Sequence, residues 1–169
     1  AQQEKRFALV IGNANYDKGA LNNPVNDALL MAKTLDSLKF DVILDTNIEN
    51  QSEFMNSIRE FGNKRDEYDL ARVYYAGHGI QIDGDNYMLP TKQKFESKFD
   101  VMDFAINVQS VMRYLTNVTG HVNILILDAC RDNPFEEKWN QSRSLKGNGL
   151  NKIPPPAGSL IAYSTDAGS

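Results

Sequence analysis

Cys130 and His78 each follow a short apolar run, and their residue types can perform nucleophilic chemistry. Cys130 comes after the run 122–127, and His78 comes after the run 70–76 with a glycine on each side. A thiol has a pKa of about 8.5 and is mostly protonated at neutral pH, so an imidazole that removes its proton makes it a far better nucleophile. We therefore predict that Cys130 is a nucleophile and His78 its general base.

Two backbone amides beside these residues could stabilise negative charge on a reacting oxygen. The small glycines around His78 leave the Gly79 N–H uncovered, and the Cys130 N–H lies beside its own sulfur. One such donor typically contributes about 3 to 4 kcal/mol of transition-state stabilisation. Gly79 and Cys130 are therefore the predicted oxyanion hole.

Each of these residues also has a structural explanation. A lone cysteine is most often a small buried hydrophobe, and a histidine between glycines can be a turn residue. A zinc site is not expected, because no second His or Cys stands at zinc-like spacing. The other histidine, His121, precedes a predicted strand at the opposite edge of the sheet and is expected to make only a local hydrogen bond.

The elements that position these residues alternate between strands and helices. Asn23-Pro24 and Asn107 begin two predicted helices, and a third covers 54–61 and ends at Gly62. Asp83-Gly84 is expected to be a hairpin turn. Strands are predicted at 7–11, 40–44, 70–76, 122–127 and 159–163. This alternation predicts an α/β fold with a mostly parallel sheet, at whose carboxyl edge His78 and Cys130 would share a crevice.

The totals indicate one domain covering residues 1–169. Apolar residues make up 41% and charged residues 24%, which is ordinary globular composition. A net charge of −4 without a basic stripe argues against nucleic acid, and no apolar run approaches the roughly 20 residues of a membrane span. We expect a soluble chain, either cytoplasmic or exported after removal of a signal peptide.

The polar segment 131–157 is predicted to be an irregular loop at the active site. Proteolytic processing of this loop is expected at Arg143, Lys146 or Lys152.

The motifs resemble those of a known family. Tyr75-Ala-Gly-His78-Gly79, followed 52 positions after the histidine by Asp128-Ala-Cys130-Arg131, resembles the caspase-fold peptidases. Further segments, 7–13, 21–28 and 128–134, are most similar to the bacterial caspase homologues related to metacaspases and paracaspases of peptidase family C14. The resemblance implies a three-layer sandwich with strand order near 2-1-3-4-5 and a cysteine endopeptidase activity. Members of this family continue into a small-subunit portion after the fifth strand, which we expect to be absent here or supplied as a separate fragment.

The resemblance also indicates the substrate. Relatives specific for basic residues use acids matching Asp27 and Asp128 to bind the residue before the scissile bond. Animal caspases, which cleave after aspartate, carry Gln at the position of Asp128 and Gly at that of Asp132. A carboxylate pocket binds guanidinium or ammonium and repels a substrate aspartate. We predict cleavage of protein or peptide substrates after Arg or Lys, although Asp27 could also be a first-turn acid favoured by the helix dipole.

Three other interpretations concern an inactive module, a nucleotide-binding domain and a calcium site. The fold also serves as a catalytically inactive interaction module, which typically loses Cys or His. A nucleotide-binding domain with magnesium at Asp128 would require a glycine-rich phosphate loop, and none follows a strand. Some relatives are activated by calcium, but Asp83, Asp85 and Asn86 lack the later Glu of a calcium loop. We therefore expect no metal site and no cofactor.

Overall fold

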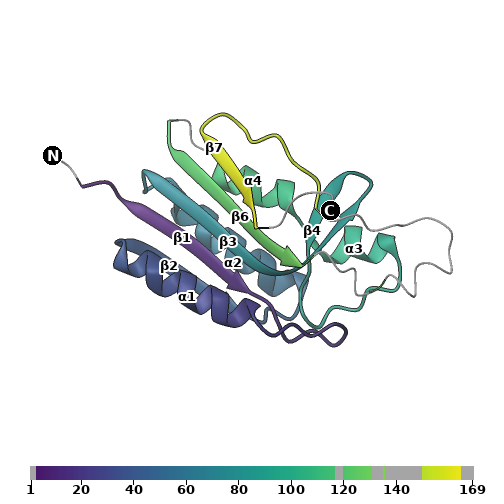
Figure 1. Cartoon of the computed structure of the whole chain (residues 1–169). Helices are drawn as coiled ribbons and strands as arrows, with labels where there is room; N and C mark the ends of the chain where they lie inside the picture. Colours follow the sequence, from purple (N-terminus) through teal and green to yellow (C-terminus); the bar gives the residue numbers. More distant parts are fainter. Residues whose placement is uncertain (1–2, 117–119, 131–134, 136–149, 165–169) are drawn as a thin grey trace.

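A mostly parallel sheet forms the centre of the protein, in a computed structural model that describes residues 3–116, 120–130, 135 and 150–164. Within these residues, five strands run in parallel in the order β2-β1-β3-β6-β7 (Figure 1). They are β1 Arg6–Gly12, β2 Phe40–Thr46, β3 Leu70–Ile82, β6 Val122–Cys130 and β7 Ser159–Tyr163. These are the five predicted strands, and the predicted order 2-1-3-4-5 is confirmed.

Helices cover both faces of this sheet, as predicted. These helices are α1 Pro24–Ser37, α2 Gln51–Arg65 and α4 Val108–Leu115, whereas α3 Lys98–Phe104 packs against the hairpin beyond the sheet edge. In Figure 1, α1 lies in front of the sheet, and α2 and α4 lie behind it. Strand β1 is buried on both sides because alternate residues face the two layers: Ala8 and Val10 pack with α1, and Leu9 and Ile11 pack with α2 and α4.

One detail of the predicted helices is wrong. Gly62 does not end a helix but lies inside α2, where a Cβ atom would overlap the ring of Tyr114 from α4. The glycine therefore allows α2 and α4 to pack closely. Asn23 does occupy the position before α1, but its side chain makes no capping hydrogen bond. In contrast, Asn107 caps α4 as predicted, by accepting a hydrogen bond from the Gln109 N–H.

Beyond the sheet edge, β3 continues past His78 into a hairpin. Strand β4, Asp85–Met88, pairs antiparallel with the end of β3 and also with the short strand β5, Ile106–Asn107. Asp83 and Gly84 both have positive φ, of 50° and 96°, as expected for a two-residue hairpin turn. The predicted turn is confirmed, whereas α3 and β5 were not predicted.

Candidate active site

The register of β3 and β6 brings the candidate nucleophile and base together. These strands pair in parallel from Leu70 opposite Val122 to His78 opposite Cys130. Adjacent strands lie about 4.8 Å apart, so the backbones of His78 and Cys130 are direct neighbours. Both stand at the carboxyl edge of the sheet, where α/β folds usually bind ligands. The two residues therefore share the sheet edge at which the sequence placed them.

The imidazole of His78 is held in one orientation by the loop between β1 and α1. The side chain is buried, and its Nε2 lies 2.6 Å from the Gly19 carbonyl oxygen. A carbonyl can only accept a hydrogen bond, so Nε2 carries the proton in this arrangement. In the neutral ring, Nδ1 is then the basic nitrogen. The geometry therefore fixes the tautomer that a general base needs.

Two tyrosines hold the backbone of His78. The His78 N–H donates to the Tyr16 hydroxyl at 3.0 Å, and the Tyr75 hydroxyl donates to the His78 carbonyl at 2.6 Å. The two hydroxyls lie 3.2 Å apart, and the Tyr16 ring packs edge-on against the imidazole with ring centres 4.5 Å apart. A Cβ atom on Gly77 would lie 2.6 Å from the Tyr75 hydroxyl, so glycine at this position leaves room for the network.

The amide of Gly79 points away from β4. The Leu89 N–H donates to the His78 carbonyl at 3.2 Å, which makes His78 and Leu89 the hydrogen-bonded pair of the hairpin. Antiparallel ladders alternate, so the next pair, Gly79 and Met88, is of the kind whose amides face outward. The Gly79 N–H therefore faces the side of β6, which is where an oxyanion donor would have to be.

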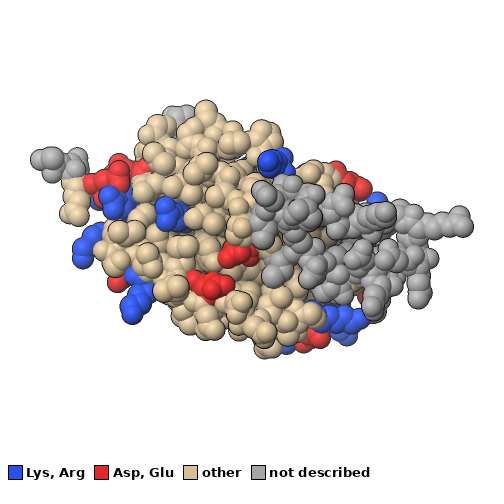
Figure 2. Space-filling view, viewed as in Figure 1, with Lys and Arg blue, Asp and Glu red and all other residues tan. Residues whose placement is uncertain are grey.

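The two predicted substrate-binding acids both act on Tyr74. Asp128 accepts a hydrogen bond from the Tyr74 hydroxyl at 3.0 Å and another from Ser164 at 2.5 Å. Burial raises the pKa of Tyr74, and the negative charges of Asp128 and then Asp27 raise that pKa further. The Tyr74 hydroxyl is therefore close enough to both carboxylates for their charges to affect its pKa. We call Asp27 and Asp128 the acidic pair. Figure 2, viewed from the α1 side, shows acidic side chains close together near the middle of this face.

The acidic pair has no basic partner among the residues that the structure describes. The ion pairs found there join other residues, such as Lys92 with Asp17 and Lys98 with Asp83. Both members of the pair are half-buried, so each is partly removed from water. The arrangement can therefore bind a cation that comes from outside the described part of the chain.

Only the end of the predicted loop 131–157 can be described, apart from Phe135. Asn86 is fully buried and exchanges two hydrogen bonds of 2.8 Å with the backbone N–H and C=O of Asn151. The Ile153 N–H donates to the Tyr163 hydroxyl at 3.1 Å. Next to Asn151, the Leu150 side chain would lie 3.0 Å from a Cβ atom on Gly79. This segment has no helix or strand, as predicted, and is tied down beside the candidate oxyanion hole. Arg143 and Lys146 lie outside the described residues.

The remaining candidates have structural roles. His121 lies at the opposite edge of the sheet, as expected, but its contact is not local: it lies 3.3 Å from the guanidinium of the buried Arg65, which is 56 positions away in the sequence. Asp83 and Asp85 belong to the hairpin, and no cluster of three or more His, Cys, Asp or Glu side chains suited to a metal occurs in the described ranges. No described helix has the length and apolar character needed to cross a membrane.

Sequence reasoning missed the residues that orient the site. Tyr16 and Gly19 lie in the β1–α1 loop, Tyr74 and Tyr75 in β3, and Asn86 in the hairpin. In the sequence, Tyr74 and Tyr75 look like ordinary strand residues. The hydrogen bond to the Gly19 carbonyl uses a backbone atom, so no residue type indicates it. A signal did exist for Tyr16, because a tyrosine in a polar loop after the first strand faces the same sheet edge.

The fold and site together define a class of α/β protein with a histidine and a cysteine at the ends of neighbouring parallel strands. Residues 5–169 match the family model described as the caspase domain, and the chain therefore belongs to the caspase domain family. It is 28% identical over 127 residues to human mucosa-associated lymphoid tissue lymphoma translocation protein 1 and 27% identical to the mouse homologue. Those residues are 75% of this chain and 15% of each relative.

Solved structures show the same fold. The Drosophila initiator caspase Dronc superposes with a TM-score of 0.62 at 12% identity, over 94% of this chain and 54% of that one. Protein GSU0716 from Geobacter sulfurreducens superposes with a TM-score of 0.59 at 17% identity, over 82% of this chain and 56% of that one. The predicted caspase-like fold is confirmed. The chain spans about half of the length of these two structures and a much smaller share of the curated relatives.

Proposed function

We propose that the protein is a cysteine endopeptidase that cleaves after Arg or Lys. The observation that carries the proposal is the pairing of His78 with Cys130 at the carboxyl edge, with His78 Nε2 bonded to Gly19. Membership of the caspase domain family supports a peptidase. The acidic pair supports the basic specificity.

The chemistry follows from these positions. His78 Nδ1 takes the thiol proton of Cys130, and the thiolate attacks the carbonyl carbon of the scissile peptide bond. The resulting oxyanion is stabilised by the Gly79 and Cys130 N–H groups. His78 then gives the proton to the leaving amine, which departs and leaves a thioester. Water, deprotonated by His78, hydrolyses the thioester and restores the thiol.

The acidic pair selects the residue before the scissile bond. A guanidinium can donate two parallel hydrogen bonds to a carboxylate, whereas a substrate aspartate would meet like charge. Tyr74 and Ser164 already hold the Asp128 carboxylate in place, which lowers the ordering cost of binding. Losing one partner of a buried charge pair costs about 2 to 5 kcal/mol, hence roughly 30-fold or more in discrimination.

Peptide cleavage tests the proposal directly. We expect the full-length natural protein to cleave internally quenched peptides at Arg or Lys and not at Asp. Cys130→Ala and His78→Ala should each reduce cleavage to below a tenth of wild type while leaving the circular dichroism spectrum unchanged. A folded wild-type protein that cleaves none of the peptides would favour the alternative, an inactive interaction module.

The specificity has its own control. Asp128→Asn removes the charge and keeps one oxygen, which can accept from either Tyr74 or Ser164, because these hydroxyls bond different carboxylate oxygens. Because the charge is lost, kcat/KM for the Arg peptide should fall by roughly 30-fold or more. Asp103→Asn, which changes an exposed acid on α3, is the matched control and should have no effect. Full-rate cleavage after Arg by Asp128→Asn would contradict the assigned role.

A further inference from the structure

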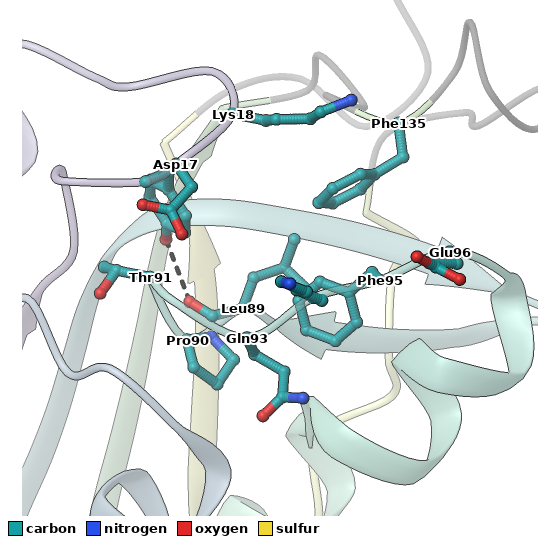
Figure 3. Close-up of a pocket in the computed structure, with 11 residues that line it drawn as sticks. Asp17, Lys18, Leu89, Pro90, Thr91, Gln93, Phe95, Glu96 and Phe135 are labelled. Atoms are coloured by element: carbon teal, nitrogen blue, oxygen red, sulfur yellow. Dashed lines mark hydrogen bonds between the residues drawn. The ribbon is translucent and has the colours of Figure 1, made fainter.

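A cavity of about 350 Å³ adjoins the candidate active site (Figure 3). We call it the Phe95 pocket, and its walls include Tyr16, Lys18, Leu89, Pro90, Phe95 and Phe135. Its size is at the lower end of the range for small-ligand sites, which suits one or two amino-acid side chains. The Proposed function leaves this pocket without a role.

The Phe95 pocket is separated from the His78 imidazole by the ring of Tyr16. Tyr16 forms part of its wall and also packs edge-on against His78, with ring centres 4.5 Å apart. Leu89, another wall residue, accepts the Tyr16 hydroxyl at 3.1 Å and bonds the His78 carbonyl through its N–H. The pocket and the candidate base therefore share one rigid group of residues.

The Phe95 pocket lies on the other side of His78 from the acidic pair. Asp27 is in the first turn of α1, and Tyr74 packs with α1 on the front face of the sheet. Tyr16 bonds instead to Tyr75, whose ring packs with α2 and α4 on the back face. When the basic side chain of a peptide is bound at the acidic pair, the nitrogen of the scissile bond must lie beside His78, because His78 protonates that nitrogen. The residues after the scissile bond then run toward the Phe95 pocket.

The distance indicates which residue arrives there. An extended peptide advances about 3.3 Å per residue, and the Tyr16 ring separates the imidazole from the pocket. The first residue after the scissile bond lies beside His78 itself. The second or third residue is the one that can reach past Tyr16.

The buried part of the lining is mainly apolar and favours an apolar side chain, whereas its exposed part carries the charged residues Asp17, Lys18, Lys94 and Glu96. Phe95 and Phe135 meet edge to face with ring centres 5.6 Å apart, and Leu89 and Pro90 are buried beside them. Asp17 at the rim is paired with Lys92 at 2.7 Å, so its charge is compensated. Figure 3 shows Lys18 extended across the opening above the Phe135 ring.

We infer that the Phe95 pocket binds an aromatic or large aliphatic side chain of the second or third substrate residue after the scissile bond. The inference rests on the proposed peptidase function, which it extends to the leaving side of the substrate. It makes the protein selective on both sides of the bond, for a basic residue before it and an apolar one shortly after it.

The test moves one phenylalanine along a peptide. Internally quenched peptides share an Arg before the scissile bond and carry Phe at the first, second or third position after it, with Ala elsewhere; an all-Ala peptide is the reference. With the full-length natural protein, Phe at the second or third position should raise kcat/KM about tenfold over the reference. Lys18→Trp, which places a bulky ring at the opening, should bring that ratio close to one, whereas Lys33→Trp on α1 should leave it unchanged.

The ratio of two peptides within one variant cancels any change at the dyad. Equal cleavage of all four peptides by wild type, or a ratio in Lys18→Trp that matches wild type, would overturn this inference and leave the peptidase proposal standing. Cleavage of none of them by the folded wild type would overturn the peptidase proposal and this inference with it.

Discussion

Removing the hydroxyl of Tyr16 should damage the protein more than removing that of Tyr75, although the two groups touch. Tyr16→Phe takes away the oxygen that accepts the buried His78 N–H at 3.0 Å. The Leu89 carbonyl, which accepts from Tyr16, keeps a second donor in the Asn13 side-chain amide at 3.1 Å. The damage is therefore concentrated on one backbone N–H, and a buried donor deprived of its acceptor costs about 1 to 3 kcal/mol.

Tyr75→Phe is the matched control because the groups it affects keep other partners. The His78 carbonyl loses the Tyr75 hydroxyl but retains the Leu89 N–H, and the Leu89 N–H retains that same carbonyl. Because these groups keep other partners, the loss is the net contribution of the hydrogen bonds of the Tyr75 hydroxyl and not the cost of an unsatisfied group, and we take it as about 1 kcal/mol. We expect urea unfolding to give a larger loss of unfolding free energy for Tyr16→Phe, by about 1 kcal/mol.

Kinetics of the Tyr16→Phe variant can distinguish an effect on the position of His78 from an effect on substrate binding. Tyr16→Phe lets the His78 backbone shift, so kcat for the Arg peptide should fall, whereas KM should stay near wild type because the acidic pair is untouched. An equal loss of stability in the two variants, or an effect of Tyr16→Phe on KM alone, would refute the reasoning that the Tyr16 hydroxyl positions His78.

Three further variants test how the fold is held together. Gly12→Ala should lower the unfolding free energy by about 1 to 3 kcal/mol in urea melts, because its Cβ would lie 2.5 Å from the Pro24 carbonyl oxygen; unchanged stability would show that α1 can move. Arg65→Lys should lower the melting temperature, because an ammonium cannot bond Asn123, Tyr68 and Val122 together as the guanidinium does, and an equal melting temperature would contradict this. Asn86→Ala removes two hydrogen bonds to Asn151, so trypsin should cut after Lys152 about tenfold faster in a Cys130→Ala background, and an unchanged rate would show that Asn86 does not hold this segment.

Strand β1 was predictable because it is a continuous apolar run buried between two layers of helices. The other four strands were predictable because each is a short, mostly apolar run, although β2 and β7 are only partly buried. The shared edge was also predictable, since parallel strands that lead into His78 and Cys130 bring both residues to the same edge of the sheet. Gly62 misled the helix prediction because a glycine that ends a helix and a glycine that admits a neighbouring ring look the same in sequence. Helix α3 was missed because seven residues with exposed Phe99 and Met102 show little apolar periodicity.

The acidic pair and the orienting groups differ in how far sequence could predict them. Asp27 and Asp128 carry a charge that a family resemblance can match, and the structure places both charges near Tyr74. The Gly19 carbonyl and the Tyr16 hydroxyl act through precise distances across a loop, and those distances depend on backbone torsions that residue types do not specify. The hydrogen bonds that hold His78 could therefore be found only in three dimensions.

The pairing of β3 with β6 also determines when the site can form as the chain folds. His78 and Cys130 are 52 positions apart, with α3, α4 and a β-hairpin strand between them. Closing so long a loop costs chain entropy before any contact repays it, and non-local pairings of this kind slow folding. A newly synthesised chain therefore keeps its histidine and cysteine apart until the sheet closes. A chain that stops before β6 contains the histidine but lacks the candidate nucleophile.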